Sequence, residues 1–457
     1  MSAAPIEMQI KLLRYFTGAG IGPGLLRAVT GSAGLRIAGM GLVFLVGVQL
    51  ARGLGAEGYG TYGLAMSIIA MLMVPTEFGL PQLLTREVAT AHARQDWGTI
   101  KGVLCWATRV SILMAVIIAA SVIAWLSFSG EALMSQLSMT LMAGVAMIPV
   151  VAQVSMRAAA LRGLQEIVKG EFPDVFLRPL LYALLLFAVP LLIVPLTPSI
   201  AMALGAVSAA LALLVAGRVL HGALPKAVEQ AVAVTNVRVW WLSTLPMAAT
   251  NGLGVLRGNL LVLVLGAMVT IGDVGNYRIA TSIIGLVLFP VSILNVVAAP
   301  YIASLHTIKN ADALKKLLFT ISAGSALGIF LLSVPFFVAG DWLIAYVFGK
   351  EFVPANMIVL ILCAGLFLSN LFGGNVVLLN MTGHHRDVML ISAFSLILLA
   401  TAAYFLIDRF ALAGAAAAFV ISNIASDFLM WVMAKRRLGM GASIFLFLSL
   451  LKAKVNH

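Results

Sequence analysis

The sequence predicts an all-α integral membrane protein with twelve transmembrane helices in two six-helix lobes around a central cavity. Three observations predict this fold class: the composition, the recurrence of apolar segments and a short internal repeat. The chain of 457 residues is 62% hydrophobic and 10% charged, whereas a soluble domain has about 25% charged residues. Apolar segments of about 20 residues, long enough to cross a bilayer as helices, recur along its whole length. We therefore expect almost the entire chain to lie in a membrane.

Twelve apolar segments have the length and composition of transmembrane helices. In chain order they are residues 33–51, 60–81, 103–126, 132–154, 177–196, 199–217, 241–266, 277–302, 317–339, 353–379, 388–407 and 411–433. The basic segment at residues 1–30 lacks a continuous apolar stretch before a cleavage site. It therefore predicts a short interfacial helix over Ile10–Phe16 and no signal peptide. The segment Ile444–Leu451 is too short to span and is expected at the membrane surface.

These spans divide the chain into two lobes with flanking segments. The N-terminal lobe is expected over residues 31–220 and the C-terminal lobe over residues 241–437, joined by a cytoplasmic linker at residues 221–240. Residues 1–30 and 438–457 are expected as cytoplasmic or interfacial ends.

The distribution of Lys and Arg orients the spans. An even number of spans places both termini on one side, and most of the 29 Lys and Arg fall in the tails, connections and adjoining helix ends of that side. The exceptions are Arg52, Arg257, Arg278, Lys350 and Arg409. The positive-inside rule then predicts that both termini are cytoplasmic. Topology and anionic lipids account for the net charge of +12, so no nucleic-acid partner is expected.

Two decapeptides indicate that the molecule is built twice. Gly60–Ile69 (GTYGLAMSII) and Gly275–Ile284 (GNYRIATSII) share six of ten residues at an offset of 215, and Pro75 and Pro290 have the same offset. Both decapeptides fall in the second span of a six-span half, which predicts parallel repeats related by an axis along the membrane normal. Each proline removes a helix hydrogen bond and predicts a bend there; the alternative is that the prolines only shape helix packing.

Several motifs, taken in order and spacing, resemble those of one family over residues 30–438. They are Arg52–Tyr62 (RGLGAEGYGTY), Glu77–Leu80 (EFGL), Thr85–Ala89 (TREVA), Val347–Ala355 (VFGKEFVPA), Asn380–His384 (NMTGH) and Leu412–Ala418 (LAGAAAA). The family is that of the bacterial polysaccharide flippases, the O-antigen and exopolysaccharide exporters of the multidrug/oligosaccharidyl-lipid/polysaccharide (MOP) superfamily. Glu77 stands where this family more often has Asp.

The resemblance implies a MATE-like fold and a multi-pass protein of the bacterial inner membrane. It implies a flippase that moves a polyprenyl-pyrophosphate-linked oligosaccharide from the cytoplasmic to the outer leaflet. The implied partners are this lipid-linked oligosaccharide, membrane lipids and other polysaccharide-assembly membrane proteins. A cation-coupled multidrug antiporter of the same superfamily is the alternative. Twelve spans rather than fourteen, and a first span without an acidic residue, favour the polysaccharide branch.

Catalytic and metal-binding patterns are not apparent in the sequence. No Ser-His-Asp or paired-carboxylate constellation and no Rossmann or P-loop motif occurs. We therefore expect neither an enzyme nor a cofactor. His92, His384 and His385 lie in connections without companion ligands, so a metal site is not expected.

The chemistry of flipping selects candidate binding residues. Each sugar hydroxyl that loses water without a replacement bond costs a few kcal/mol, and arginine can bind an anionic pyrophosphate bidentately. Arg257, deep in the seventh span with Thr250 on the same helix face, is the first candidate, and Arg36 in the first span is the second. Arg278 beside the eighth span is a third. The alternatives are an acid partner for Arg257, an interfacial anchor for Arg36 and a surface position for Arg278.

Two acids are candidates for ion coupling. Asp427 lies in the last span within a polar stripe and can bind a proton or cation, or alternatively pair with Lys435 or Arg257. Glu77 lies at the cytoplasmic end of the second span, where helix capping or ion pairing is the alternative. A set of aromatic residues fits an interfacial belt: Tyr59, Tyr62, Trp240, Trp241 and Trp431.

Overall fold

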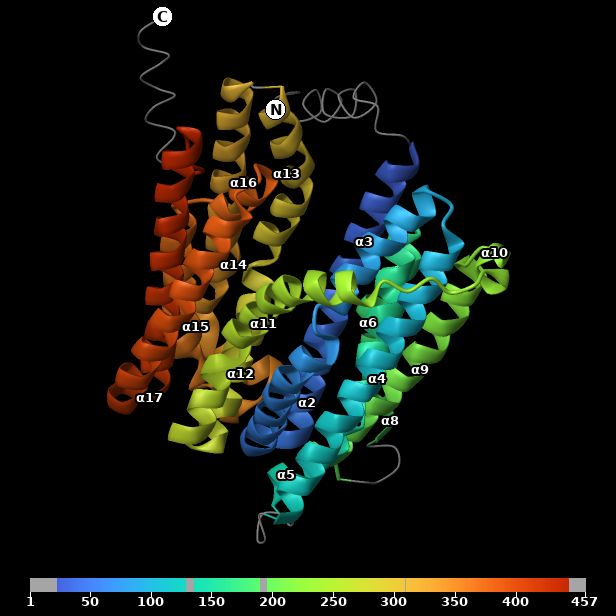
Figure 1. The fold of residues 1–457 in the computed structure, drawn as a ribbon. Coiled ribbons are helices and arrows are strands. Elements are labelled where there is room, and N and C mark those ends of the chain that lie inside the picture. The colour runs from blue at the N-terminus through green and yellow to red at the C-terminus, as the bar shows by residue number, and fades with distance from the viewer. Residues whose placement is uncertain (1–22, 129–134, 190–194, 309, 444–457) are drawn as a thin grey trace, which may run out of the picture.

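The computed structural model describes residues 23–128, 135–189, 195–308 and 310–443, and every regular element in these ranges is a helix (Figure 1). The predicted segments at Ile10–Phe16 and Ile444–Leu451 lie outside the described residues. The first half contains α2 (Pro23–Glu77), α3 (Leu80–Ala93), α4 (Trp97–Phe128), α5 (Gln136–Val145), α6 (Met147–Gly163), α7 (Ile167–Glu171), the π-helix η2 (Phe172–Leu177), α8 (Arg178–Ala188) and α9 (Pro198–Ala223).

A short helix, α10 (Lys226–Gln230), lies in the connection to the second half. The helices of the second half are α11 (Val237–Met268), α12 (Ile271–Val287), α13 (Phe289–Thr307), α14 (Ala311–Val347), the 3₁₀-helix η4 (Lys350–Phe352), α15 (Ala355–Asn370), α16 (Asn375–Met381) and α17 (His385–Leu438).

Several helices are long and apolar enough to cross a membrane. Among the described residues there are 8 such helices, or 9 if α15 and α16, which are bent by 46°, form one span. α2 has 55 residues and α17 has 54, whereas about 20 suffice for one crossing. Each contains one residue with non-helical backbone angles, Gly55 (φ 67°) and Ala411 (φ 46°). These residues separate the first two and the last two predicted spans; the total of twelve stays a prediction.

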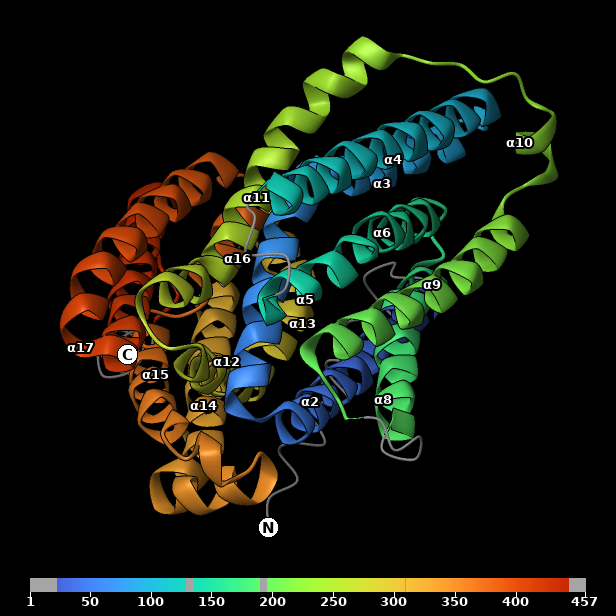
Figure 2. The same cartoon turned by 90° about the horizontal axis from the view of Figure 1, so that it is seen from below.

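The arrangement of the helix ends agrees with an even number of crossings. α2 begins and α17 ends at the same end of the molecule, the upper end in Figure 1. In the view from below, α3–α9 lie on one side of the molecule and α14–α17 on the other, and α2 and α11 run between them (Figure 2). The predicted lobe boundaries stay predictions, because α11 contacts both sides.

A buried tryptophan makes one of the contacts of α11 with the first half. Trp240 is 2% exposed and packs with Leu80, Leu84 and Val103 of α3 and α4. Farther along α11, Ala248 approaches Gly79 so closely that a Cβ on this glycine would lie 2.7 Å from the Ala248 backbone nitrogen. The seventh predicted span therefore begins against the N-terminal half.

The two repeated decapeptides meet where α2 crosses α12. A Cβ on Gly60 would lie 1.9 Å from the Ile271 carbonyl oxygen, and one on Gly275 would lie 2.3 Å from the Ala56 carbonyl oxygen. Only glycine allows backbones to approach this closely. Residues that correspond in the repeat therefore contact each other. This is the geometry expected on a two-fold axis that relates the two halves.

The prolines at the repeat offset both lie beside helix breaks. Pro75 precedes the break between α2 and α3, where Phe78 and Gly79 have φ of 40° and 72°. Pro290 lies in the first turn of α13, directly after the break that separates it from α12 at Leu288. Whether these positions bend between states stays a prediction.

Candidate functional site

Two adjoining cavities lie where the halves meet. The larger, the central cavity, has a volume of about 690 Å³ and is walled by α2, η2, α8, α12 and α13. The smaller, the tyrosine recess, has a volume of about 230 Å³ and is lined by Tyr59, Tyr62 and Tyr182 with Arg178 and Arg278. The two cavities share four lining residues: Val43, Arg178, Pro179 and Ser282.

The walls of the central cavity are mostly apolar. On α2 they include Ile37, Met40 and Phe44, and on α13 they include Phe289 and Ile293. The charged residues that line either cavity in the described chain are Arg36, Arg178, Arg278 and Asp174. The cavities therefore combine apolar walls with an excess of positive charge, which suits an anionic group attached to a hydrocarbon chain.

Arg36 is held at the cavity by a buried acid. Its guanidinium forms an ion pair with Glu171, whose side chain is 3% exposed, and its Nε donates to Glu171 Oε2 at 3.2 Å. Ser32 also donates to Glu171 Oε2, at 2.5 Å. The Arg36 side chain stays 55% exposed. Glu171 therefore fixes the orientation of the guanidinium while part of it remains available to a ligand.

Arg178 is positioned by the π-helix η2. Asp174, within η2, pairs with Arg178 at 3.0 Å between Oδ1 and Nη1, one turn apart. α2 approaches this segment closely, because a Cβ on Gly39 would lie 2.3 Å from the Val175 carbonyl oxygen. π-helical turns inside α-helices are often found at functional sites. Here the π-helix brings Asp174 and Arg178 together at the boundary of the two cavities.

Glu77 belongs to the same charged cluster. It interacts electrostatically with Asp174, Arg162 and Arg178 and lies beside Ser155. Arg162 in turn interacts with Glu171 and Asp174. Glu77 does not line either cavity. Glu77 therefore lies close to Arg178 without lining a cavity, and its charge interacts electrostatically with that arginine.

Arg278 enters the recess from the second half of the molecule. It lies on α12 and packs against Gly63 of α2, where a Cβ would be 2.9 Å from Arg278 Cγ and 3.0 Å from its Nε. Positions 63 and 278 are themselves separated by the repeat offset of 215. Within the described residues Arg278 forms no ion pair. The glycine in one repeat therefore makes room for the arginine of the other, which leaves an unpaired cation at the recess.

Three tyrosines line the recess beside apolar side chains such as Leu50 and Met147. The Tyr182 hydroxyl donates to the Ala201 carbonyl oxygen at 2.9 Å and lies 3.2 Å from the Tyr62 hydroxyl. Tyr59 and Tyr62 are 4% and 7% exposed. The interpretation of these two residues and Trp240 as an interfacial belt is therefore wrong, because tertiary packing buries them between helices.

Arg257 and Thr250 lie away from both cavities. Arg257 Nη2 donates to Asn423 Oδ1 of α17 at 2.5 Å and interacts electrostatically with Asp427. Asp427 accepts a hydrogen bond from Ser369 of α15. Thr250 is exposed, and its hydroxyl bonds the Pro246 carbonyl oxygen of its own helix. Of the four candidate binding residues, the structure brings Arg36 and Arg278 to the cavities.

Three cavity residues were not among the sequence candidates: Asp174, Arg178 and Tyr182. Arg178 falls among the basic residues that the charge distribution assigns to the cytoplasmic side. An Asp and an Arg four residues apart at the start of an apolar segment were the available signal, because such a pair lies on one helix face. Nothing in the sequence marked Tyr182.

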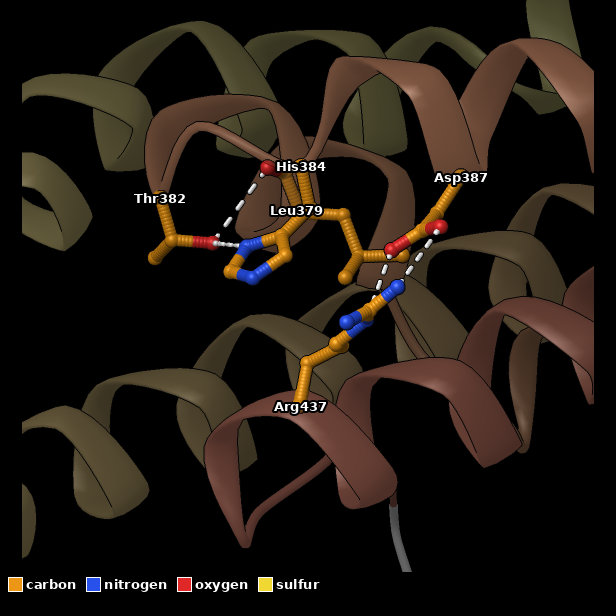
Figure 3. Close-up of polar contacts among 5 residues, drawn as sticks. All are labelled: Leu379, Thr382, His384, Asp387 and Arg437. Carbon is orange, nitrogen blue, oxygen red and sulfur yellow. Dashed lines mark hydrogen bonds and ion pairs between the residues drawn. The ribbon is translucent and has the colours of Figure 1, made fainter.

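The Asn380–His384 motif forms the end of α16 and the turn that leads to α17 (Figure 3). Thr382 Oγ1 lies 3.1 Å from His384 Nδ1 and donates to the Leu379 carbonyl oxygen at 3.3 Å. Nearby, Arg437 pairs with Asp387 at 3.1 Å and joins the two ends of α17 (Figure 3). In the described part of the chain, no three His, Cys, Asp or Glu side chains are grouped to hold a metal ion.

Two other motifs meet and connect the halves. Arg52 donates to two carbonyl oxygens at the end of α14, Val347 at 2.8 Å and Tyr346. Glu351 Oε2 accepts from the Ala56 backbone nitrogen at 3.0 Å, where the second part of α2 begins. Each charge complements the dipole of the helix end that it binds. We call this pair of contacts the helix-end clasp.

Aromatic contacts accompany the clasp. Phe348 packs edge-on against Phe44, with ring centroids 5.7 Å apart, and Phe352 packs against Tyr59 at 6.1 Å. α14 begins beside the end of α13 at the upper end of Figure 1 and runs away from it. Its C-terminus, and the clasp with it, therefore lies at the end opposite to that where α2 begins and α17 ends.

The fold, with its long apolar helices, is shared with solved structures of membrane transporters, among them two MATE transporters and the lipid II flippase MurJ. An inward-facing MATE family multidrug resistance transporter of the MOP superfamily has a TM-score of 0.72 at 14% identity, covering 89% of this chain and 98% of that one. The lipid II flippase MurJ, in an inward closed conformation, has a TM-score of 0.69 at 10% identity, covering 90% and 87%. An outward-facing MATE transporter has a TM-score of 0.63 at 15% identity, covering 90% and 96%.

The sequence itself assigns the family. The chain belongs to the polysaccharide biosynthesis protein family, whose model matches residues 25–306. No curated protein matches the sequence. This family agrees with the predicted resemblance to polysaccharide exporters. The structural likeness confirms a helical fold shared with MOP-superfamily transporters, whereas the count of twelve spans stays a prediction.

Proposed function

We propose that this protein is a flippase for a polyprenyl-pyrophosphate-linked oligosaccharide. It moves its substrate from the cytoplasmic to the outer leaflet of the bacterial inner membrane by alternating access, for O-antigen or exopolysaccharide biosynthesis. The observation that carries the proposal is the cavity itself. Three arginines and one aspartate lie within apolar walls, which matches a substrate with an anionic pyrophosphate and a hydrocarbon tail.

The anionic part and the apolar part of the substrate each meet side chains of matching chemistry. Arg36, Arg178 and Arg278 supply charge-assisted hydrogen bonds to pyrophosphate oxygens. The apolar faces of α2 and α13 contact the first isoprene units. An inside-negative membrane potential favours outward movement of an anion by about 2.3 kcal/mol per charge per 100 mV. In the proposed orientation of the protein both termini are cytoplasmic, as the distribution of Lys and Arg predicts.

The conformation supports alternating access. The clasp joins the halves at one end of the molecule, whereas the α2 residues that line the central cavity lie between Ala33 and Phe44, before Arg52 of the clasp. With cytoplasmic termini, the clasp lies toward the outer side of the membrane, so release there requires the clasp to open.

Coupling to an ion is assigned to the second half. Arg257, Asn423, Asp427 and Ser369 connect α11, α15 and α17. Protonation or cation binding at Asp427 would change its attraction to Arg257 and thereby the packing of α11, which contacts both halves. Glu77 is the corresponding candidate in the first half, because it lies within the charged cluster behind the cavity.

The test is export in a deletion strain. Loss of the gene is expected to cause accumulation of polyprenyl-linked repeat units in the cytoplasmic leaflet, and complementation with the wild-type gene is expected to reverse it. Arg278→Ala should fail to complement, whereas Lys350→Ala, an exposed basic residue outside the cavities, should complement fully. Normal glycan export in the deletion strain, with altered resistance to cationic drugs, would instead support the multidrug antiporter.

A further inference from the structure

We infer that the tyrosine recess binds the first sugar of the substrate, the one attached to the pyrophosphate. The inference rests on the proposed function and deepens it, because it states which part of the headgroup each cavity holds. The recess is lined by Tyr59, Tyr62 and Tyr182 together with Arg178 and Arg278.

The order of chemical groups along the cavities matches the order of groups in the substrate. The central cavity has apolar walls on α2 and α13, and Arg178 and Ser282 lie where it adjoins the recess. Beyond them, three tyrosines and Ser208 line the recess together with apolar side chains: Val46, Leu50, Met66 and Met147. A lipid-linked sugar has the same sequence of hydrocarbon, anionic phosphates and polyhydroxylated ring. With the pyrophosphate at Arg178, the first sugar reaches the recess.

The recess offers groups that can replace the water around a sugar. Tyrosine hydroxyls both donate and accept hydrogen bonds. The Tyr59 hydroxyl has no hydrogen-bond partner among the described residues, and the Arg278 guanidinium has no ion-pair partner there. Among the residues that the structure describes, no acidic side chain lines the recess. A buried sugar can therefore bond to Tyr59 and Arg278 without displacing an existing interaction.

The size of the recess restricts its occupant. Its volume of about 230 Å³ is below the lower limit of about 300 Å³ for sites that hold drug-sized ligands. It therefore suits one sugar ring and excludes an extended oligosaccharide. Discrimination between substrates at this site is therefore expected to depend on the first sugar.

The recess is also shared between the halves. Arg278 reaches it from α12 by packing on Gly63 of α2, whereas the tyrosines belong to the first half. A rocking motion of the halves would withdraw Arg278 from the tyrosines. All groups of the sugar site therefore lie together in the conformation described here. They separate when the molecule opens on the other side, and this separation favours release of the substrate.

Binding to two defined lipids tests the inference. The full-length protein in nanodiscs is titrated with polyprenyl pyrophosphate and with the same lipid carrying one N-acetylhexosamine. The wild-type protein is expected to bind the glycosylated lipid about tenfold more tightly, as two or three additional hydrogen bonds allow. Tyr59→Phe is expected to reduce this preference about threefold and to leave the affinity for the sugar-free lipid unchanged.

A second variant fills the recess without altering a tyrosine. A Cβ on Gly47 would lie 3.8 Å from the Tyr59 hydroxyl, an ordinary contact, so Gly47→Val is expected to fold and to abolish the preference for the sugar. Tyr404→Phe, at an exposed tyrosine outside the cavities, is the matched control. Arg178→Ala is expected to weaken binding of both lipids.

The outcomes separate the inference from the proposed function. Equal affinity of the wild-type protein for the two lipids would overturn the sugar site. So would equal losses for both lipids in Tyr59→Phe and Gly47→Val, or no loss in either variant. Failure of the wild-type protein to bind either lipid would instead contradict the proposed flippase function.

Discussion

Opening of the clasp end can be tested by removing either charge of the helix-end clasp. Arg52 binds two carbonyl oxygens at the end of α14, and Glu351 binds the backbone nitrogen of Ala56. In the described chain the two side chains form no ion pair with each other. Arg52→Ala and Glu351→Ala are therefore expected to act independently, and each should favour separation of the halves at this end.

The magnitude follows from the geometry. Hydrogen bonds to charged groups contribute about 1.5–3 kcal/mol, but Arg52 is exposed, and exposed charges at helix ends contribute about 0.3–1 kcal/mol. We take about 1 kcal/mol for each side of the clasp, which changes the ratio of open to closed molecules about fivefold. If the contributions are independent, the double variant changes it about 25-fold. Phe348 and Phe352 remain in place in all three variants.

The assay is a distance distribution between the halves. Spin labels at Ser127→Cys on α4 and Arg409→Cys on α17, with Cys105 and Cys363 replaced, report separation by pulsed electron resonance. Lys350→Ala, an exposed neighbour of Glu351, is the control and should match the unmodified protein. A charge exchange separates helix-end binding from a salt bridge. If Arg52→Glu with Glu351→Arg restores the original distribution, the two residues pair with each other and the helix-end argument is refuted.

Three further predictions concern packing, coupling and capping. Gly60→Ala should abolish stable expression, because its Cβ would lie 1.9 Å from a backbone oxygen, whereas Gly258→Ala, with nothing within 4 Å, should behave as wild type in size-exclusion profiles. Arg257→Ala should slow transport in proteoliposomes without weakening lipid binding; a loss of affinity as large as that of a cavity arginine would place it in the binding site. Asp96 caps α4 through Thr99, and these hydrogen bonds lower the pKa of its carboxyl group. The ionised Asp96 therefore stabilises the fold at pH values above its unfolded pKa, and this stabilisation is lost as the pH falls through the lower folded pKa. Asp96→Ala should accelerate hydrogen exchange in the first turn of α4 at pH 7, but should have no effect below the folded pKa.

Some cavity residues were predictable because their signal is local. An arginine within an apolar segment must face protein, water or a headgroup rather than lipid, which selected Arg36 and Arg278 without knowledge of the fold. The same rule selected Arg257, but it does not state which of these environments applies. In the structure Arg257 turns toward Asn423 and Asp427 of the second half, away from the cavities.

The sequence by itself predicted the apolar helices, the internal repeat and the resemblance to the family. These depend on composition, on the length of apolar segments and on residue identities at a constant offset, all of which are readable along the chain. It also placed the glycines that define the repeat, although not that Gly60 and Gly275 would contact each other.

Only the tertiary structure decided which faces of the helices form the site. In a membrane both the lipid-facing and the protein-facing sides of a helix are apolar, so periodicity alone does not distinguish them. Tyrosine is a residue type typical of an interfacial belt, yet Tyr59 and Tyr62 are buried because α2 packs against α8 and α12. The recess, its arginine from the opposite half and the helix-end clasp depend on contacts between segments more than 100 residues apart, and such contacts are decided by packing of the complete chain.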